Sequence, residues 1–194
     1  MPSSASVVTP KRFAAGLSYE EFLAQAKVNK DQFEANYKSA KVSDADAAAI
    51  KKLIATPGGP ARVLVLGEDW CPDVYRGLPV IVRIAESTGM ELKVFPRDKN
   101  LDIMNEYLKD GQFQSIPTVV FFTRETKYIA HWIERPVQAN ADRAVINEQI
   151  KKDMPSASEQ DLRAESRKRT AAYYPAWQKE TVKEIRALLE KAAR

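Results

Sequence analysis

The sequence has very little of the sulfur and imidazole that build disulfide frameworks and metal centres. Its 194 residues include one cysteine, Cys71, and one histidine, His131. A single cysteine excludes an internal disulfide and favours a reducing compartment, so we expect a cytoplasmic protein. These two residues also provide too few soft ligands for a zinc site. We therefore predict neither a metal nor another cofactor.

Long apolar runs and a strong charge of one sign are absent as well. No run approaches the ~20 apolar residues that cross a bilayer, so we expect no contact with a membrane. The formal net charge of +4 falls entirely within residues 151–194, where acidic and basic residues are interleaved. This mixture is typical of a solvated helix face, and no nucleic-acid-binding motif accompanies it. Nucleic acid is therefore not an expected partner.

The first 16 residues lack the features of a secretory signal, which has a basic start followed by an apolar stretch. They are rich in serine and free of acidic residues, as transit peptides are. However, Pro2 and Pro10 disfavour the amphipathic helix that transit peptides form. We therefore predict that residues 1–16 are a disordered tail.

Residues 17–56 are predicted to form three short helices that pack on the core. The helix starts are marked by residue types that cap backbone N–H groups: Ser18 with Glu21, Asn29, and Ser43 or Asp44. A Pro-Gly-Gly-Pro sequence at 57–60 then breaks the chain sharply.

Strands and helices alternate in residues 57–151, which we predict to form the core. Short, mostly apolar runs rich in valine indicate strands, and segments with helical apolar spacing follow them. The predicted strands are 62–66, 91–95, 117–122 and 127–133, and the predicted helices are 72–87, 101–108 and 137–151. This alternation predicts an α/β protein.

Residues 152–194 are predicted to be a helical extension of the same compact domain. Ser156 and Glu159 have the spacing of a second capping box, and Pro175 interrupts the helix. An apolar stripe beyond that proline consists of Val182, Ile185, Leu188 and Leu189. We expect the stripe to pack on the core or on another helix.

Cys71 follows a predicted strand and directly precedes a predicted helix. At a helix start, unpaired backbone N–H groups and the positive end of the helix dipole stabilise a thiolate. The pKa of such a thiol can fall well below its free value of about 8.5. The alternative is a buried, inert cysteine, but the neighbours Glu68, Asp69, Pro72 and Asp73 suit a core position poorly. We therefore predict that Cys71 is a nucleophile.

The segment Trp70-Cys71-Pro72-Asp73-Val74 resembles the Trp-Cys-x-x-Cys active-site segment of thioredoxins, and more closely the Trp-Cys-Pro-Asp-Cys variant of bacterial thioredoxin-like proteins. Pro79 stands where thioredoxins have the proline that kinks the active-site helix. Ser115-Ile116-Pro117-Thr118 precedes a hairpin, as the Ile-Pro-Thr segment of thioredoxins does. The resemblance covers about residues 60–135. It implies a thioredoxin-like fold, a central mixed sheet flanked by helices, with a cis Ile116–Pro117 bond beside Cys71.

Two positions depart from the thioredoxin pattern. Val74 stands where the family has its resolving cysteine, so Cys71 could form a mixed disulfide but not resolve it. Val65 stands where thioredoxins bury an acidic residue used in proton handling. Asp73 is the nearest carboxylate: its charge would raise the thiol pKa, although its place at a helix start is favourable. His131 could pair with Cys71 as a base, but its place on a predicted strand favours a structural or surface residue.

Three functions fit these residues. The first is a thiol-redox protein in which Cys71 exchanges with a disulfide and an external thiol completes the cycle, as in monothiol glutaredoxins. Its partners would be proteins or low-molecular-weight thiols and disulfides. The second is a non-catalytic module that holds a protein or peptide in the cis-proline groove. The third is a dithiol enzyme in which Val74 is a recent or engineered replacement. We favour the first, with substrate contacts from Trp70, Pro72, Asp73, Ile116 and Pro117.

Overall fold

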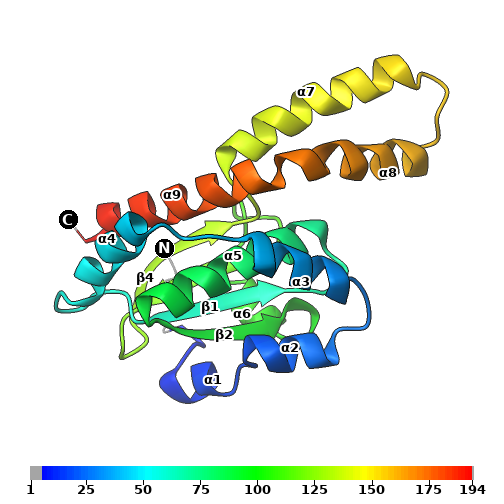
Figure 1. Ribbon diagram of the computed structural model, residues 1–194. Helices are drawn as coiled ribbons and strands as arrows, with labels where there is room; N and C mark the ends of the chain where they lie inside the picture. The colour runs from blue at the N-terminus through cyan, green and yellow to red at the C-terminus, as the bar shows by residue number, and fades with distance from the viewer. Residues whose placement is uncertain (1–5, 194) are drawn as a thin grey trace.

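A four-stranded mixed sheet forms the centre of the protein (Figure 1). The computed structural model describes residues 6–193, and its strand order is β2-β1-β3-β4. Strand β1 (Arg62–Gly67) runs parallel to β2 (Glu91–Pro96) and antiparallel to β3 (Thr118–Phe122), which pairs antiparallel with β4 (Tyr128–Ile133). The α/β architecture predicted from the sequence is confirmed.

Helices cover the sheet on both faces. Residues 63–66 of β1 are all fully buried although their side chains alternate between the two faces, so neither face of this strand meets solvent. The long helix α5 (Pro72–Thr88) packs on β1 and β2, and α3 (Lys30–Ser39) and α4 (Asp44–Ile54) pack on α5. No helix among the described residues is long and apolar enough to cross a membrane.

Helix α5 begins and ends at residues that suit helix termini. Pro72 is at the first helical position, where its missing N–H leaves no hydrogen bond unmade. Gly89 ends the helix with a φ of 84°, a left-handed conformation that glycine adopts without strain. Pro79 lies inside the helix, as the thioredoxin resemblance implied. The strand, the turn and the helix start around Cys71 are therefore placed as predicted.

The N-terminal segment is ordered where the structure describes it, so the prediction of a disordered tail is wrong for residues 6–16. Helix α1 (Pro10–Ala14) starts at Pro10, which is tolerated in the first turn, and the Thr9 hydroxyl caps it. Phe13 is fully buried and its ring lies 5.1 Å from the Arg62 guanidinium carbon. The Ser6 hydroxyl donates to Glu106 at 2.7 Å. The prediction for residues 1–5 lies outside the described residues.

The N-terminal helices form as expected, with one difference at a helix start. Helix α2 (Tyr19–Gln25) has the predicted capping box between Ser18 and Glu21. Asn29 precedes α3 in a left-handed conformation and makes no capping hydrogen bond, and its side-chain Nδ2 donates to the Asp69 carbonyl oxygen at 2.9 Å. This side chain therefore connects α3 to the loop that carries Trp70 and Cys71.

The predicted helix 101–108 is shorter in the structure. A 3-10 turn (Arg97–Lys99) leads into α6 (Leu101–Met104), after which the chain continues through turns. Tyr107 is still buried, at 3% exposure. The apolar pattern thus extends past the point where helical hydrogen bonding ends, which is why the sequence indicated a longer helix.

The C-terminal helices divide into a protruding hairpin and a packed helix. Helices α7 (Val137–Asp153) and α8 (Glu159–Thr170) pair with each other and stand off from the sheet (Figure 1). The predicted boundary between residues 151 and 152 therefore falls inside α7. Ser158 caps α8, two residues after the predicted Ser156, because its hydroxyl accepts from the Asp161 N–H.

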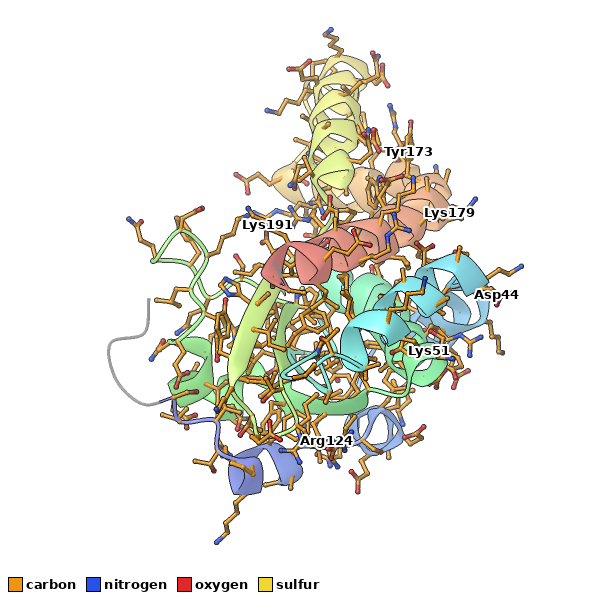
Figure 2. All side chains as sticks on the ribbon, turned by 90° about the vertical axis from the view of Figure 1, so that its left-hand side faces the viewer. Asp44, Lys51, Arg124, Tyr173, Lys179 and Lys191 are labelled. Carbon is orange, nitrogen blue, oxygen red and sulfur yellow. The ribbon has the colours of Figure 1, made fainter. Side chains whose placement is uncertain are left out.

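Helix α9 (Tyr174–Ala192) returns over the body and lies beside α4 (Figure 2). A short 3-10 turn (Ala171–Tyr173) separates it from α8, with Pro175 in its first turn. Val182, Ile185 and Leu189 are buried against the core. The apolar stripe predicted from the sequence is thus a packing face.

Candidate functional site

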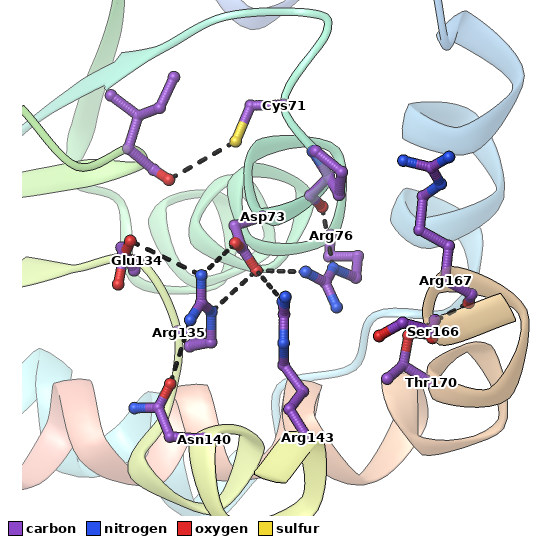
Figure 3. Close-up of polar contacts among 12 residues, drawn as sticks. Cys71, Asp73, Arg76, Glu134, Arg135, Asn140, Arg143, Ser166, Arg167 and Thr170 are labelled. Carbon is purple, nitrogen blue, oxygen red and sulfur yellow. Dashed lines mark hydrogen bonds and ion pairs between the residues drawn. The ribbon is translucent and has the colours of Figure 1, made fainter. Parts of the chain in front are cut away.

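Cys71 lies at the N-terminal end of α5, directly opposite the segment that precedes β3. Its Sγ donates to the Ile116 carbonyl oxygen at 3.7 Å, and the Ile116–Pro117 peptide bond is cis. The contact with Ile116 is drawn in Figure 3. The side chain is nearly covered, with the residue 8% exposed. The structure therefore brings Cys71, Ile116 and Pro117 together.

The pKa of Cys71 is raised, which contradicts the lowered value expected from its place at a helix start. Burial is the largest cause, because it disfavours the charged thiolate. The Val74 and Asp73 N–H groups and the Arg76 guanidinium lower the pKa, whereas the Asp73 carboxylate raises it. The helix-start effect is real but is outweighed by desolvation, so the protonated thiol predominates at neutral pH.

Val74 and Val65 are both fully buried. A Cβ atom added to Gly67 would lie 2.8 Å from Val74 Cγ1, so the end of β1 and the first turn of α5 approach each other very closely. Val65 is paired with Val94 on one side and Val119 on the other. The two positions at which the sequence departs from thioredoxins are thus filled by tight apolar packing.

Asp73 is surrounded by three arginine side chains (Figure 3). Its carboxylate is ion-paired with Arg76 on the same helix. Arg135 Nε donates to Oδ1 at 3.1 Å and Nη2 to Oδ2 at 2.5 Å. Arg143 approaches Oδ1 at 3.6 Å, too far for a hydrogen bond. The negative charge of Asp73 is therefore more than balanced.

Two aromatic rings and one backbone carbonyl group hold Arg76 in place. Its Nε donates to the Pro72 carbonyl oxygen at 2.9 Å. Its guanidinium carbon lies 4.8 Å from the centre of the Tyr174 ring and 5.3 Å from that of Trp177. Both rings come from the start of α9, so the C-terminal helix is part of the site and not a peripheral addition.

The segment after β4 supplies Arg135 and borders the cis-proline. The Glu134 N–H donates to the Pro117 carbonyl oxygen at 2.7 Å, and its carboxylate binds Lys109 Nζ at 2.6 Å. Arg135 Nη1 also donates to the Asn140 side chain at 3.1 Å. Sequence reasoning missed Arg135 and Arg143, because no motif or spacing connects them with Cys71.

Trp70 lies on the surface beside the thiol, with half of the residue exposed. The Arg97 guanidinium carbon stacks 5.8 Å from its ring centre, and Arg97 Nη1 donates to the Gln114 carbonyl oxygen at 3.1 Å. Arg97 therefore links the loop of Cys71 to the segment that precedes Ile116. Trp70 presents an apolar surface next to that segment.

His131 takes part in an aromatic cluster on β4. Its Nδ1 lies 2.7 Å from the Tyr128 hydroxyl, and its ring centre lies 5.6 Å from that of Tyr107. Burial lowers its pKa. The structural role that its strand position favoured is the one its contacts support. Residues 6–193 contain no group of three side chains able to hold a metal ion.

Comparison with known proteins gives a family match and two similar folds. A family model described as thioredoxin matches residues 16–149, which adds helices α2 to α4 and most of α7 to the resemblance. No curated protein matches the chain.

Both similar structures cover nearly the whole chain. The crystal structure of a protein of unknown function from Pseudomonas aeruginosa is 17% identical, covers 95% of this chain and 99% of its own, and has a TM-score of 0.65. An HIV epitope-scaffold is 16% identical, covers 96% of this chain and 99% of its own, and has a TM-score of 0.66. Together with the family match, they confirm the thioredoxin-like fold predicted from the sequence.

Proposed function

Because this chain belongs to the thioredoxin family, we propose that it is a thiol-redox protein that acts through the single nucleophile Cys71 and needs an external thiol for release. The observation that carries this proposal is the contact of 3.7 Å between Cys71 Sγ and the Ile116 carbonyl oxygen. A substrate chain that lies along the Ile116–Pro117 segment would present its disulfide to this sulfur.

The proposed reaction consists of two thiol–disulfide exchanges. In the first, the Cys71 thiolate attacks one sulfur of the substrate disulfide, a new sulfur–sulfur bond forms, and the other substrate sulfur leaves as a thiolate. In the second, the thiolate of a low-molecular-weight thiol attacks the mixed disulfide and releases Cys71. Val74 has no thiol with which to carry out this second step, so the external thiol is required.

The charges near Cys71 set the expected rate of the first step. Burial keeps the thiol mostly protonated, which slows attack, because only the thiolate is nucleophilic. The Arg76 guanidinium and two backbone N–H groups act in the opposite direction. We therefore expect slow exchange that accelerates as the pH rises towards the raised pKa of Cys71.

Substrate contacts are assigned to the residues around the sulfur. The exposed ring of Trp70 offers an apolar surface, the backbone of Ile116 offers strand-like pairing to an extended chain, and the ring of Pro117 would lie beside that chain. Pro72 and Asp73 form the helix start against which the bound segment would rest.

A turnover assay with glutathione and a small mixed disulfide tests this proposal. We expect the wild-type protein to exceed the Cys71→Ser variant, which retains the shape of the site and lacks the sulfur. A rate equal to that of Cys71→Ser would reject the redox function. Mass spectrometry of the trapped protein should find one glutathione attached at Cys71.

A non-catalytic binding module is the second candidate, and it is favoured by the near-complete burial of Cys71 and its raised pKa. Val74→Cys distinguishes the two, with Val82→Cys as the control, since both are buried valines of α5. If the remaining site is suited to exchange, Val74→Cys should reduce a protein disulfide in the presence of dithiothreitol and Val82→Cys should not. Inactivity of both would favour the binding module.

A further inference from the structure

A cavity of about 440 Å³ lies between the first turn of α5 and the protruding α7–α8 hairpin. Pro72 and Asp73 line the end next to Cys71, and Ser166 and Thr170 of α8 line the facing wall. Figure 3 shows Asp73 with Arg143 at one end and α8 with Ser166 and Thr170 at the other. A cavity of this size suits a small organic molecule.

The side chains that line this cavity carry an excess of positive charge. The cationic ones are Arg76, Arg143, Lys151, Arg163 and Arg167, and the carboxylates are Asp73 and Glu159. Both carboxylates are already engaged: Asp73 with its arginines, and Glu159 with Arg163 at 3.0 Å. Within the described part of the chain, Lys151 and Arg167 pair with no carboxylate.

Arg143 is partly buried, yet no carboxylate among the described residues forms a hydrogen bond with it. It lies 3.6 Å from Asp73 Oδ1, and hydrogen bonds from Arg76 and Arg135 already occupy that carboxylate. Burial and the neighbouring Arg135 both lower the pKa of Arg143, which reflects the lack of a full counter-charge. Its N–H groups are therefore available to an incoming anion.

The remaining lining is apolar or neutral and polar. Leu162 of α8 and the ring of Tyr174 supply apolar surface to the cavity, whereas Ile150 of α7 is 1% exposed and offers almost none. The Ser166 hydroxyl donates to Asn147 Oδ1 at 2.8 Å, which connects α7 and α8 across the cavity wall. An inorganic ion alone would leave this apolar surface uncovered.

We propose that the cavity between α5, α7 and α8 binds a small organic anion, with its carboxylate or phosphate group at Arg143, further positive charge from Arg167 on α8, and its apolar body against Leu162 and Tyr174. Carboxylate and phosphate share the planar, bidentate recognition that arginine provides. The cavity shares Pro72 and Asp73 with the proposed substrate surface, but Cys71 does not line it, so an anion bound there does not need the sulfur. Binding is therefore expected to be the same in Cys71→Ala.

Isothermal titration with three matched aromatic probes tests the proposal: phenyl phosphate, benzoate and benzyl alcohol. We expect saturable binding of at least one anionic probe at about millimolar Kd, and none of the neutral alcohol. Comparison of phenyl phosphate with benzoate identifies the preferred anionic group. Titrations at equal ionic strength remove non-specific screening effects.

Variants of the arginines that line the cavity test whether the probes bind there. Arg143→Gln removes the proposed contact with the anionic group and should weaken binding at least about tenfold. Arg167 is exposed and pairs with no carboxylate among residues 6–193, so Arg167→Gln should fold normally and weaken binding as well. Arg124→Gln is the control, since Arg124 is exposed in the β3–β4 turn at the opposite end of the molecule from the hairpin (Figure 2).

The proposal would be overturned by the absence of saturable binding of either anion at about 10 mM or by equal binding of benzyl alcohol. It would also be overturned by an equal loss in Arg124→Gln or by unchanged binding in Arg167→Gln. Because Cys71→Ala is titrated in parallel, failure of the redox function would leave this result intact. Loss of binding in Cys71→Ala alone would place the probe at the thiol and also overturn the proposal.

Discussion

Arg135 binds both carboxylate oxygens of Asp73, with contacts of 3.1 Å and 2.5 Å. This pair joins the first turn of α5 to the segment after β4, 62 residues away in the chain. Both side chains are largely buried. Their interaction therefore fixes the position of the helix start that carries Cys71.

We expect Asp73→Asn to lower the free energy of unfolding by about 3 kcal/mol. The variant leaves Arg76, Arg135 and Arg143 without their shared carboxylate, and an uncompensated buried charge is strongly destabilising. Urea unfolding measures the loss. Asp102→Asn is the control, because its pair with Arg12 at 3.3 Å is much more exposed and should contribute less than about 1 kcal/mol. Equal losses in the two variants would contradict the assignment.

The same substitution should lower the pKa of Cys71. The Asp73 carboxylate raises that pKa in the wild type, whereas the neighbouring Arg76 lowers it and remains in the variant. The rate of alkylation by iodoacetamide, followed against pH, gives the pKa directly. In the wild type the rate should rise with a midpoint above that of an unfolded peptide spanning residues 68–76. In Asp73→Asn the midpoint should move to lower pH, and an upward shift would disprove the charge relationship.

Gly67→Ala should destabilise the protein by about 1–3 kcal/mol, because its new methyl group would lie 2.8 Å from Val74 Cγ1. When Val74 is also replaced by alanine, most of this loss should disappear. The Val74 methyl group that the new methyl group at position 67 would contact is then absent. A double-mutant cycle by urea unfolding measures the coupling between the two positions. Additive losses would mean that the strand and the helix do not make this close contact.

Phe13→Ala should reduce the free energy of unfolding by about 3–5 kcal/mol. Phe13 is fully buried against the sheet, although it belongs to the segment that the sequence indicated was disordered. Phe113 is the matched control, because it is 57% exposed and its replacement by alanine should change stability by less than about 0.5 kcal/mol. Thermal unfolding of the two variants side by side checks this, and similar melting temperatures would restore the disordered-tail interpretation.

The sequence by itself determined the local elements around the site. The apolar run of β1, the Pro72 helix start and the Gly89 helix end depend on neighbouring residues, so they could be predicted from short segments. The Ser18 capping box could be predicted for the same reason. The order of Cys71, Pro79 and Ile116-Pro117 was sufficient to indicate the thioredoxin-like fold.

Predictions from short stretches of sequence were wrong at two positions where the burial of a side chain is decisive. Pro10 argued against a helix, yet it starts α1, because the Phe13 side chain inserts into the core. The helix start predicted a lowered pKa for Cys71, yet desolvation by the surrounding structure raises it. Burial depends on every element that packs around a residue, and a short window of sequence does not contain that information.

Only the tertiary structure decided the electrostatics of the site. Arg135 and Arg143 reach Asp73 from segments more than 60 residues further along the chain, and α9 brings Tyr174 and Trp177 to Arg76. Coulombic interactions depend on distance in space, so charges that are remote in sequence can dominate a site. The sequence motif was enough to locate the thiol of Cys71. Only the tertiary structure shows which arginines surround the neighbouring carboxylate of Asp73.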